Sequence, residues 1–304
     1  MNLLYTPGAA CWLLTDGFSR SGSWQKEKNM KKAILTILSI CVMPIIVNAA
    51  VGPNWIEQWG ITWTFDKNIS LDGSGDAYRY GQFVNGDYWI VGPVKIINID
   101  PAPLNRRNGS MVNPRYSAYQ GYDERAVNFD ETLYKVPPIE LNPGDSMISC
   151  ISLAELQRKS YIKSNAVLTV VDTPQSADKF RPPYTRPERV SRSLDDPLIF
   201  SANSIKWDYL PRLPKITNTP AISVSAAKLQ RINTEHAKGW SIRNTVTAVD
   251  GPPQYGRDIS NVVSEISMQL VLDYTNEEKM PAIINLIQYG IDLYGVYLDE
   301  GVWA

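Results

Sequence analysis

The chain has 304 residues, of which 44% are hydrophobic and 20% are charged, and its formal net charge at pH 7 is −1. This composition is ordinary for a globular protein and leaves room for a large core or two domains. The charge balance does not suggest the basic face that nucleic-acid binding needs, so we predict no nucleic-acid partner. The single histidine excludes a metal site built from several histidines.

Residues 30–49 have the three parts of a secretory signal peptide. Two lysines near its start are followed by the apolar run 33–47 and then by small residues around Ala49. A transmembrane helix is the alternative, but the run is too short to span a bilayer and contains Pro44. We therefore predict cleavage after Ala49, a secreted or periplasmic location, and no stable membrane span in the mature chain.

Residues 1–29 precede the signal peptide and show no periodic pattern, so we expect an unstructured upstream extension. A lipoprotein signal ending at Cys41 is a minor alternative, because Ile40 is too large for the position before the cysteine. Removal of residues 1–49 takes away five Lys/Arg and two Asp/Glu and leaves a net charge of −4. Cys150 then remains as the one cysteine, so no internal disulfide forms and stability depends on core packing. We predict that Cys150 is a small buried hydrophobic residue.

Residues 50–172 are predicted to form an antiparallel β-sandwich domain. Asn85-Gly86 lies between two apolar runs and is a strong hairpin signal, because both residues can adopt positive φ. Other segments alternate between apolar and polar residues or are rich in β-branched and aromatic ones, which favours strands at 61–65, 88–91, 94–99, 146–152 and 166–171. Short strands separated by turn signals suggest a sandwich of the immunoglobulin-like or jelly-roll kind.

Nine aromatic residues fall between residues 55 and 89. They could form a sugar-stacking platform, because the C–H groups of a sugar ring make an apolar face. Core packing is the alternative, since aromatic side chains bury large areas. The candidates for ligand binding are Trp59, Trp63, Tyr88 and Trp89. The acidic turn at 72–76 could offer oxygens to calcium but lacks the spacing of a known loop motif, so we predict no metal site.

Residues 173–220 are predicted to be a proline-rich linker, because the prolines disfavour both a helix and a central strand. We expect an extended connector over the surface. Its first half is rich in arginine and includes Arg181 and Arg186. Arginine forks bind carboxylates and sulfates, so an acidic polysaccharide could be a ligand. The alternative is a solvated linker whose arginines pair with the acidic surface.

Residues 221–304 are predicted to be helical. Apolar residues recur at helical spacing over 258–274 and again over 279–297. Thr275 and Glu278 form a capping box that begins the second helix. The two helices therefore form an αα-hairpin. Both are apolar on more than one side, so we expect a truncated start of a helical array that is loosely held in this chain.

Catalytic candidates are few. Tyr255, Arg257 and Asp258 lie at the N-terminus of the first helix, where anions bind, and they are usable acid, base and clamp groups. His236 is a fourth candidate. The alternatives are a helix cap for Asp258 and a hydrogen-bonded or surface role for His236. The sequence contains no Ser-His-Asp arrangement, metal-ligand cluster, phosphate loop or nucleotide fingerprint, so we predict no cofactor and leave open whether the chain is an enzyme.

The order of signal peptide, β-sandwich, linker and helical hairpin resembles secreted bacterial polysaccharide-active enzymes, in which a sandwich precedes an (α/α) toroid. Segments 83–94, 109–114, 180–184 and 289–295 also resemble large uncharacterised exported bacterial proteins. The resemblance implies the N-terminal part of a polysaccharide-degrading enzyme, a glycoside hydrolase or a polysaccharide lyase, with most catalytic groups beyond residue 304. A non-catalytic cell-envelope or glycan-binding structural module is the alternative.

Overall fold

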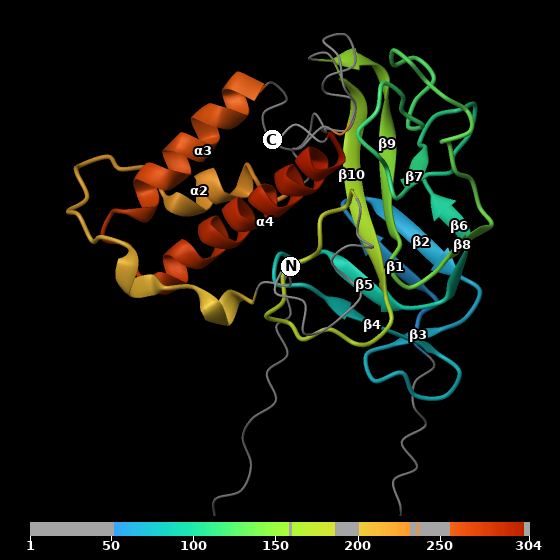
Figure 1. Ribbon diagram of the computed structural model, residues 1–304, viewed down its shortest axis with the longest axis horizontal. Coiled ribbons are helices and arrows are strands. Elements are labelled where there is room, and N and C mark those ends of the chain that lie inside the picture. Colours follow the sequence, from blue (N-terminus) through green and yellow to red (C-terminus); the bar gives the residue numbers. More distant parts are fainter. Residues whose placement is uncertain (1–51, 158–159, 186–200, 232–235, 237–255, 301–304) are drawn as a thin grey trace, which may run out of the picture. The chain divides into compact units, whose positions relative to one another are not determined.

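The computed structural model describes residues 52–157, 160–185, 201–231, 236 and 256–300 (Figure 1). All of them belong to the compact unit that spans residues 51–304. The predicted upstream extension and signal peptide lie outside the described residues. Within the described part of the chain, no helix combines the length and the apolar character that a membrane crossing requires.

Two sheets make up the β region. The first has four strands in the order β1-β2-β6-β8, and every neighbouring pair is antiparallel. Its strands are β1 (Trp55–Gln58), β2 (Ile61–Phe65), β6 (Val94–Asp100) and β8 (Ile139–Leu141). The second has six strands in the order β3-β4-β5-β10-β9-β7. They are β3 (Ile69–Ser70), β4 (Tyr78–Gln82), β5 (Tyr88–Val91), β10 (Ser160–Val171), β9 (Ser146–Gln157) and β7 (Ser110–Val112).

The sandwich-like arrangement confirms the predicted fold class, with one departure from purely antiparallel pairing. β5 pairs with β10 in parallel, and so does β3 with β4. The chain leaves β5 at Gly92 and crosses into the other sheet as β6. A Cβ atom at Gly92 would collide with the Val170 side chain on β10, so the crossing requires glycine. The Asn-Gly hairpin is confirmed between β4 and β5, with Gly86 at φ +89°.

The main core lies between the two sheets. Inward positions alternate with outward ones along β2, and along β6 except at a bulge where Ile97 and Asn98 are both exposed. The inward side chains of both sheets form one buried cluster. Trp63 is completely buried, and its indole N–H donates to the Ser149 hydroxyl on the opposite sheet at 2.9 Å. Full burial of one such large apolar side chain contributes about 1.5–3 kcal/mol, so this interface stabilises the β region. Cys150 is buried in a second cluster, as predicted.

Among the described residues, the α-helices that follow the β region are α2 (Ile222–Ala227), α3 (Gly256–Leu270) and α4 (Asn276–Glu300). Their apolar faces meet in a separate cluster, which confirms that the predicted helix pair packs together and adds the short α2 to it. The capping box is formed: Thr275 N–H donates to the Glu278 carboxylate at 2.7 Å, and Glu278 N–H donates to the Thr275 hydroxyl at 3.2 Å.

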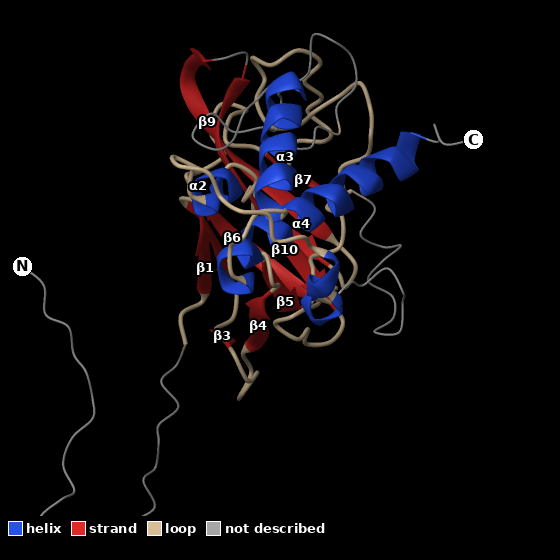
Figure 2. Cartoon of the chain, turned by 90° about the vertical axis from the view of Figure 1, so that its left-hand side faces the viewer, coloured by secondary structure: helices blue, strands red, loops and turns tan. Residues whose placement is uncertain are grey.

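The six-stranded sheet lies between the four-stranded sheet and the helices (Figures 1 and 2). Val296 on α4 belongs to the same buried cluster as Ile148 of β9 and Val167 of β10. Residues 180–185 of the predicted linker are buried as well, and they run between the β region and α4. The remaining described part of the linker contains two short 3₁₀ helices, Ala202–Ser204 and Trp207–Tyr209.

Candidate functional site

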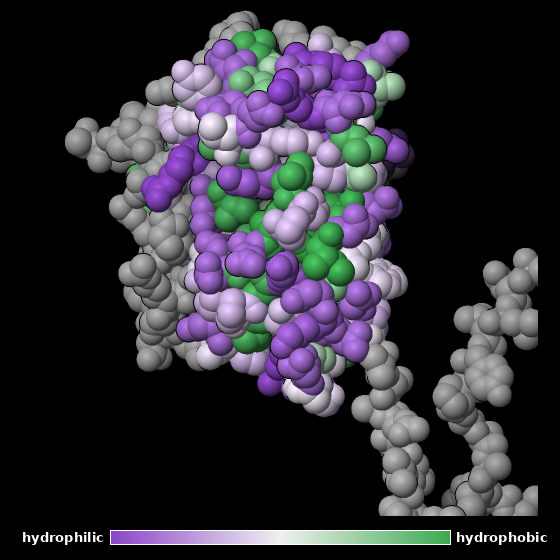
Figure 3. Space-filling model, turned by 90° about the vertical axis from the view of Figure 1, so that its right-hand side faces the viewer, coloured by the Kyte–Doolittle hydropathy of each residue, from purple (hydrophilic) through white to green (hydrophobic). Residues whose placement is uncertain are grey.

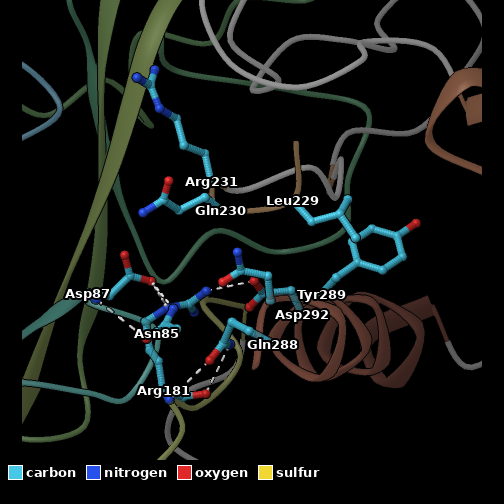
Figure 4. Close-up of a pocket in the computed structure, with 10 residues that line it drawn as sticks. Asn85, Asp87, Arg181, Leu229, Gln230, Arg231, Gln288, Tyr289 and Asp292 are labelled. Carbon is cyan, nitrogen blue, oxygen red and sulfur yellow. Dashed lines mark hydrogen bonds and ion pairs between the residues drawn. The ribbon is translucent and has the colours of Figure 1, made fainter. Parts of the chain in front are cut away.

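A buried ion-pair network joins the β region, the linker and α4 (Figure 4). Arg181 is only 1% exposed. Its Nε donates to Asp87 Oδ2 at 2.6 Å, and its Nη2 donates to Asp292 Oδ2 at 2.6 Å. Asp87 closes the Asn-Gly turn before β5, whereas Asp292 lies on α4. Hydrogen bonds between charged groups are the strong ones, so these three residues, called here the Arg181 clamp, fix three distant segments to one another.

Neutral amides complete the clamp. Gln288 accepts from the Arg181 backbone N–H and donates to the Arg181 carbonyl, at 3.1 Å in both cases. Asn85 and Gln58 each donate a side-chain N–H to the Asp87 carboxylate, at 2.7 and 2.9 Å. Buried charges are tolerated only when their remaining hydrogen-bonding sites are filled, and these amides fill them.

The clamp contains two carboxylates and one guanidinium, so it has an excess of negative charge when all three groups are ionised. Burial disfavours the charged guanidinium, but Asp292 and Asp87 outweigh it and raise the pKa of Arg181 above its usual value. Burial also raises the pKa of the Asp292 carboxyl, against the opposing effect of Arg181. Asp292 therefore takes up a proton more readily than an ordinary aspartate does.

This pKa shift predicts a dependence of stability on pH. Because the pKa of Asp292 is higher in the folded chain than in the unfolded chain, the folded chain binds the extra proton. The resulting stabilisation is fully present at a pH below the ordinary pKa of an aspartate, and it is lost as the pH rises through the raised pKa of Asp292. We expect Asp292→Asn to remove the part of the fall in unfolding free energy that occurs as the pH rises above the ordinary aspartate pKa of about 4, as measured by urea titrations at several pH values.

The matched control is Asp273→Asn, which changes an exposed carboxylate just before α4. It should leave the slope of stability against pH as it is in the native chain. Equal slopes for Asp292→Asn and the native chain would contradict the assignment of the buried proton to Asp292.

A recess opens beside the clamp, between the turn before β5, the end of α2 and the inner face of α4 (Figure 4). Its cavity volume is about 10 Å³, room for about one water molecule, so a ligand could place a single polar group in it and would otherwise lie against its rim. Four side-chain amides contribute to its wall, together with one phenol, one leucine and a second arginine: Asn85, Gln230, Asn285, Gln288, Tyr289, Leu229 and Arg231. The recess therefore offers many hydrogen-bonding groups and little apolar surface.

Arg231 is held on the sheet side of the recess. Its guanidinium lies 4.3 Å from the centre of the Trp59 ring and donates to the Ser164 hydroxyl at 3.0 Å. Trp59 occupies the turn between β1 and β2 with φ +56°, next to Gly60 at φ +80°, which fits a type I′ hairpin turn. This turn places the ring of Trp59, a residue predicted to contact a ligand, against the guanidinium of Arg231.

The other aromatic candidates pack mainly inside the β region. Trp63 lies in the main core, and Trp89, 4% exposed, packs with Phe83 and Val171. Tyr88 is half-buried, with its ring centre 6.3 Å from that of Tyr80. The structure thus buries Trp63 and Trp89 in the β region and leaves Tyr88 partly exposed. These three side chains do not form one exposed platform.

The catalytic candidates lie in two different settings. His236 is buried between Tyr122 and Tyr184, and both ring centres are 5.7 Å from its own. Arg257 and Asp258 lie together on the exposed first turn of α3, where Arg257 Nε is 3.5 Å from Asp258 Oδ1. Tyr255 and Arg186 lie outside the described residues.

Sequence reasoning missed most of the clamp and the recess. Asn285, Gln288 and Asp292 follow one another on α4 at intervals of three and four residues, so they share one face of an otherwise apolar helix. This polar stripe was the available signal. Asp87 gave none, because an aspartate after Asn-Gly is equally well explained by the turn.

Among the described residues, no group of three or more His, Cys, Asp or Glu side chains is arranged to hold a metal ion. Comparison with known proteins gives no match: no family model, no curated protein and no solved structure is significantly similar to this chain.

Proposed function

We propose that the chain is an exported module that binds a polysaccharide without cleaving it. The observation that carries this proposal is the convergence of amide, phenol and guanidinium groups on one recess beside the Arg181 clamp. A sugar presents many hydroxyl groups, each able to donate and accept, and side-chain amides can match both roles at once. Binding sites for small ligands commonly combine such convergent polar groups with a preformed wall, which the clamp supplies here.

Binding without cleavage is favoured by the placement of the carboxylates. Hydrolysis of a glycosidic bond ordinarily uses one carboxylic acid and one carboxylate that flank the scissile bond. Asp87 and Asp292 do lie near each other, but both accept from Arg181. The guanidinium therefore occupies the space that a substrate bond would need between them.

The charge of the site favours a neutral polysaccharide over an acidic one. Arg181, the residue expected to bind an acidic ligand, is already paired with two carboxylates. The recess wall contains two carboxylates, Asp87 and Asp292, and two arginines, Arg181 and Arg231, so its formal charges balance and it has no excess of positive charge to attract uronate or sulfate groups. A neutral chain of sugars needs no such attraction.

Gln230 offers a direct test, because its side chain lines the recess and is exposed, so its loss should not disturb the fold. We expect Gln230→Ala to weaken binding of a neutral polysaccharide by up to about tenfold, the effect of losing one hydrogen bond. Affinity electrophoresis of the processed chain in gels containing neutral or acidic polysaccharides measures this.

Gln175→Ala is the matched control, since Gln175 lies on the loop after β10 and does not line the recess. It should bind like the native chain. Failure of the native chain to bind any neutral polysaccharide would refute the proposed function, and equal losses in both variants would refute the recess as the site.

A second candidate, the N-terminal part of a polysaccharide-degrading enzyme, is supported by a different observation. Helices follow the sandwich-like β region, in the order found in the enzymes that the sequence resembles. These helices also leave large apolar side chains exposed, among them Val224, Met268 and Tyr294, where further helices could pack. Release of reducing ends or of unsaturated sugars by the purified chain would establish this function and would contradict binding without cleavage.

A further inference from the structure

The outer face of the four-stranded sheet carries a half-exposed tryptophan among hydroxyl and amide side chains. Strand alternation buries Ile56 on β1 and leaves Trp55 outside, 49% exposed. In the strand register Trp55 is opposite Thr64, and Thr64 is opposite Asn98. These three side chains therefore form one row across β1, β2 and β6 on the outer face.

A second row runs beside the first. Glu57 is opposite Thr62, and Thr62 is opposite Asp100. Neighbouring strands are about 4.8 Å apart, so each row extends over roughly 10 Å of the surface. Figure 3 views the side on which β6 and β8 lie in Figure 1, and there hydrophobic atoms gather in the middle with hydrophilic ones around them. Ile97 on β6 is one of the exposed apolar residues of this sheet.

The chemistry of the two rows fits the ring of a sugar. An indole face can cover the apolar C–H face of the ring, and the adjacent threonine and asparagine groups can exchange hydrogen bonds with its hydroxyls. Trp55 contrasts with Trp63 and Trp89, which the same chain buries almost completely. Because covering an apolar surface is favourable, the half-exposed Trp55 leaves an indole area that a ligand could cover.

The charged side chains of this face favour neutral glycans over anionic ones. Glu57 and Asp100 place negative charge at one end of the rows, and the nearby Lys95 is 3.6 Å from Glu140 and so is already paired. An anionic glycan would therefore be repelled, whereas a neutral one would not. The length of a row suits a short stretch of an extended chain.

We propose that this outer face, centred on Trp55 with Thr64 and Asn98, is a second glycan-binding surface that takes an extended neutral polysaccharide. The inference rests on the proposed function for the class of ligand only, because the surface and the recess share no residue. Two separate contacts on one polysaccharide would raise the avidity of the chain for a polymer above that for a short oligosaccharide.

The test compares the native chain, Trp55→Ala, Gln230→Ala and the double variant by calorimetric titration with a soluble neutral polysaccharide. Trp55→Ala should weaken binding at least about tenfold and Trp55→Phe should restore part of the loss. Tyr209→Ala is the control, because it removes an exposed aromatic ring from a 3₁₀ helix outside the sheet.

The outcomes separate the two sites. Unchanged affinity in Trp55→Ala, together with weakened binding in Gln230→Ala, would overturn the second surface and would still support the recess as a binding site. Weakened binding in Trp55→Ala with unchanged affinity in Gln230→Ala would support the second surface and would refute the recess as a binding site. If light scattering shows that the native chain is a dimer and that Trp55→Ala is a monomer with unchanged affinity, the face is an interface between copies and the inference is overturned.

Discussion

Replacement of Arg181 by methionine is expected to lower the free energy of unfolding by about 3–5 kcal/mol. The change removes the cation that pairs with two buried carboxylates, Asp87 and Asp292, and takes that counter-charge away from both. This is among the largest effects that a single substitution produces, and it would be measured by urea unfolding near neutral pH.

Two further variants distinguish the loss of the Arg181 clamp from a general destabilisation caused by removing any arginine. Arg106→Met removes an arginine whose ion pairs with Glu124 and Glu131 are exposed, so it should cost less than about 1 kcal/mol. The triple variant Arg181→Met, Asp87→Asn, Asp292→Asn should recover part of the loss, because it removes the unpaired charges together with the cation. A loss below about 1 kcal/mol in Arg181→Met would mean that the clamp does not hold the segments together.

Two glycines of α4 are expected to respond to alanine with opposite signs. Gly295 is buried against the linker: a Cβ atom there would collide with the Pro183 side chain and would lie 2.7 Å from Thr185 Oγ1. Gly290 has no such neighbour, since nothing lies within 4 Å of an added Cβ. We expect Gly295→Ala to destabilise by about 1–3 kcal/mol through overpacking, and Gly290→Ala to stabilise by about 0.5–1 kcal/mol through helix propensity.

The pair forms its own control, because both substitutions raise helix propensity by the same amount and differ only in their surroundings. Thermal and urea unfolding of the two variants would measure the difference. If Gly295→Ala stabilises as much as Gly290→Ala, the linker does not pack closely on α4, and the contact between the β region and the helices is weaker than described here.

Local pattern in the sequence determined most of the individual elements. Alternation between apolar and polar residues located β2 at the residues it occupies, and the Asn-Gly dipeptide located the hairpin between β4 and β5. The Thr275–Glu278 capping box marked the start of α4. These signals are readable because the backbone conformation of a turn or a helix end depends on the few residues that form it.

The short elements and the exact ends of elements were harder to predict from the sequence. The prediction missed the three-residue strands β7 and β8 and the six-residue α2, because so few residues carry no measurable period. It also extended α3 through residue 274, whereas the helix ends at Leu270 and Leu272 instead forms a β-bridge with Leu213. The end of α3 therefore depends on pairing with a distant segment of the chain, which the local sequence does not show.

Only the tertiary structure decided what the polar and aromatic residues do. Arg181 reads as a solvated arginine in a proline-rich linker, yet its two carboxylate partners come from segments 94 and 111 residues away. Of two tryptophans on neighbouring strands, Trp63 faces the opposite sheet and Trp55 faces outward, because one position on a strand reverses the direction of the side chain. The pattern of residues in the sequence shows only where apolar and charged residues stand along the chain. Which face of a sheet it occupies, and which distant group it meets, depends on how the sheets and helices pack, and packing is set by the whole chain.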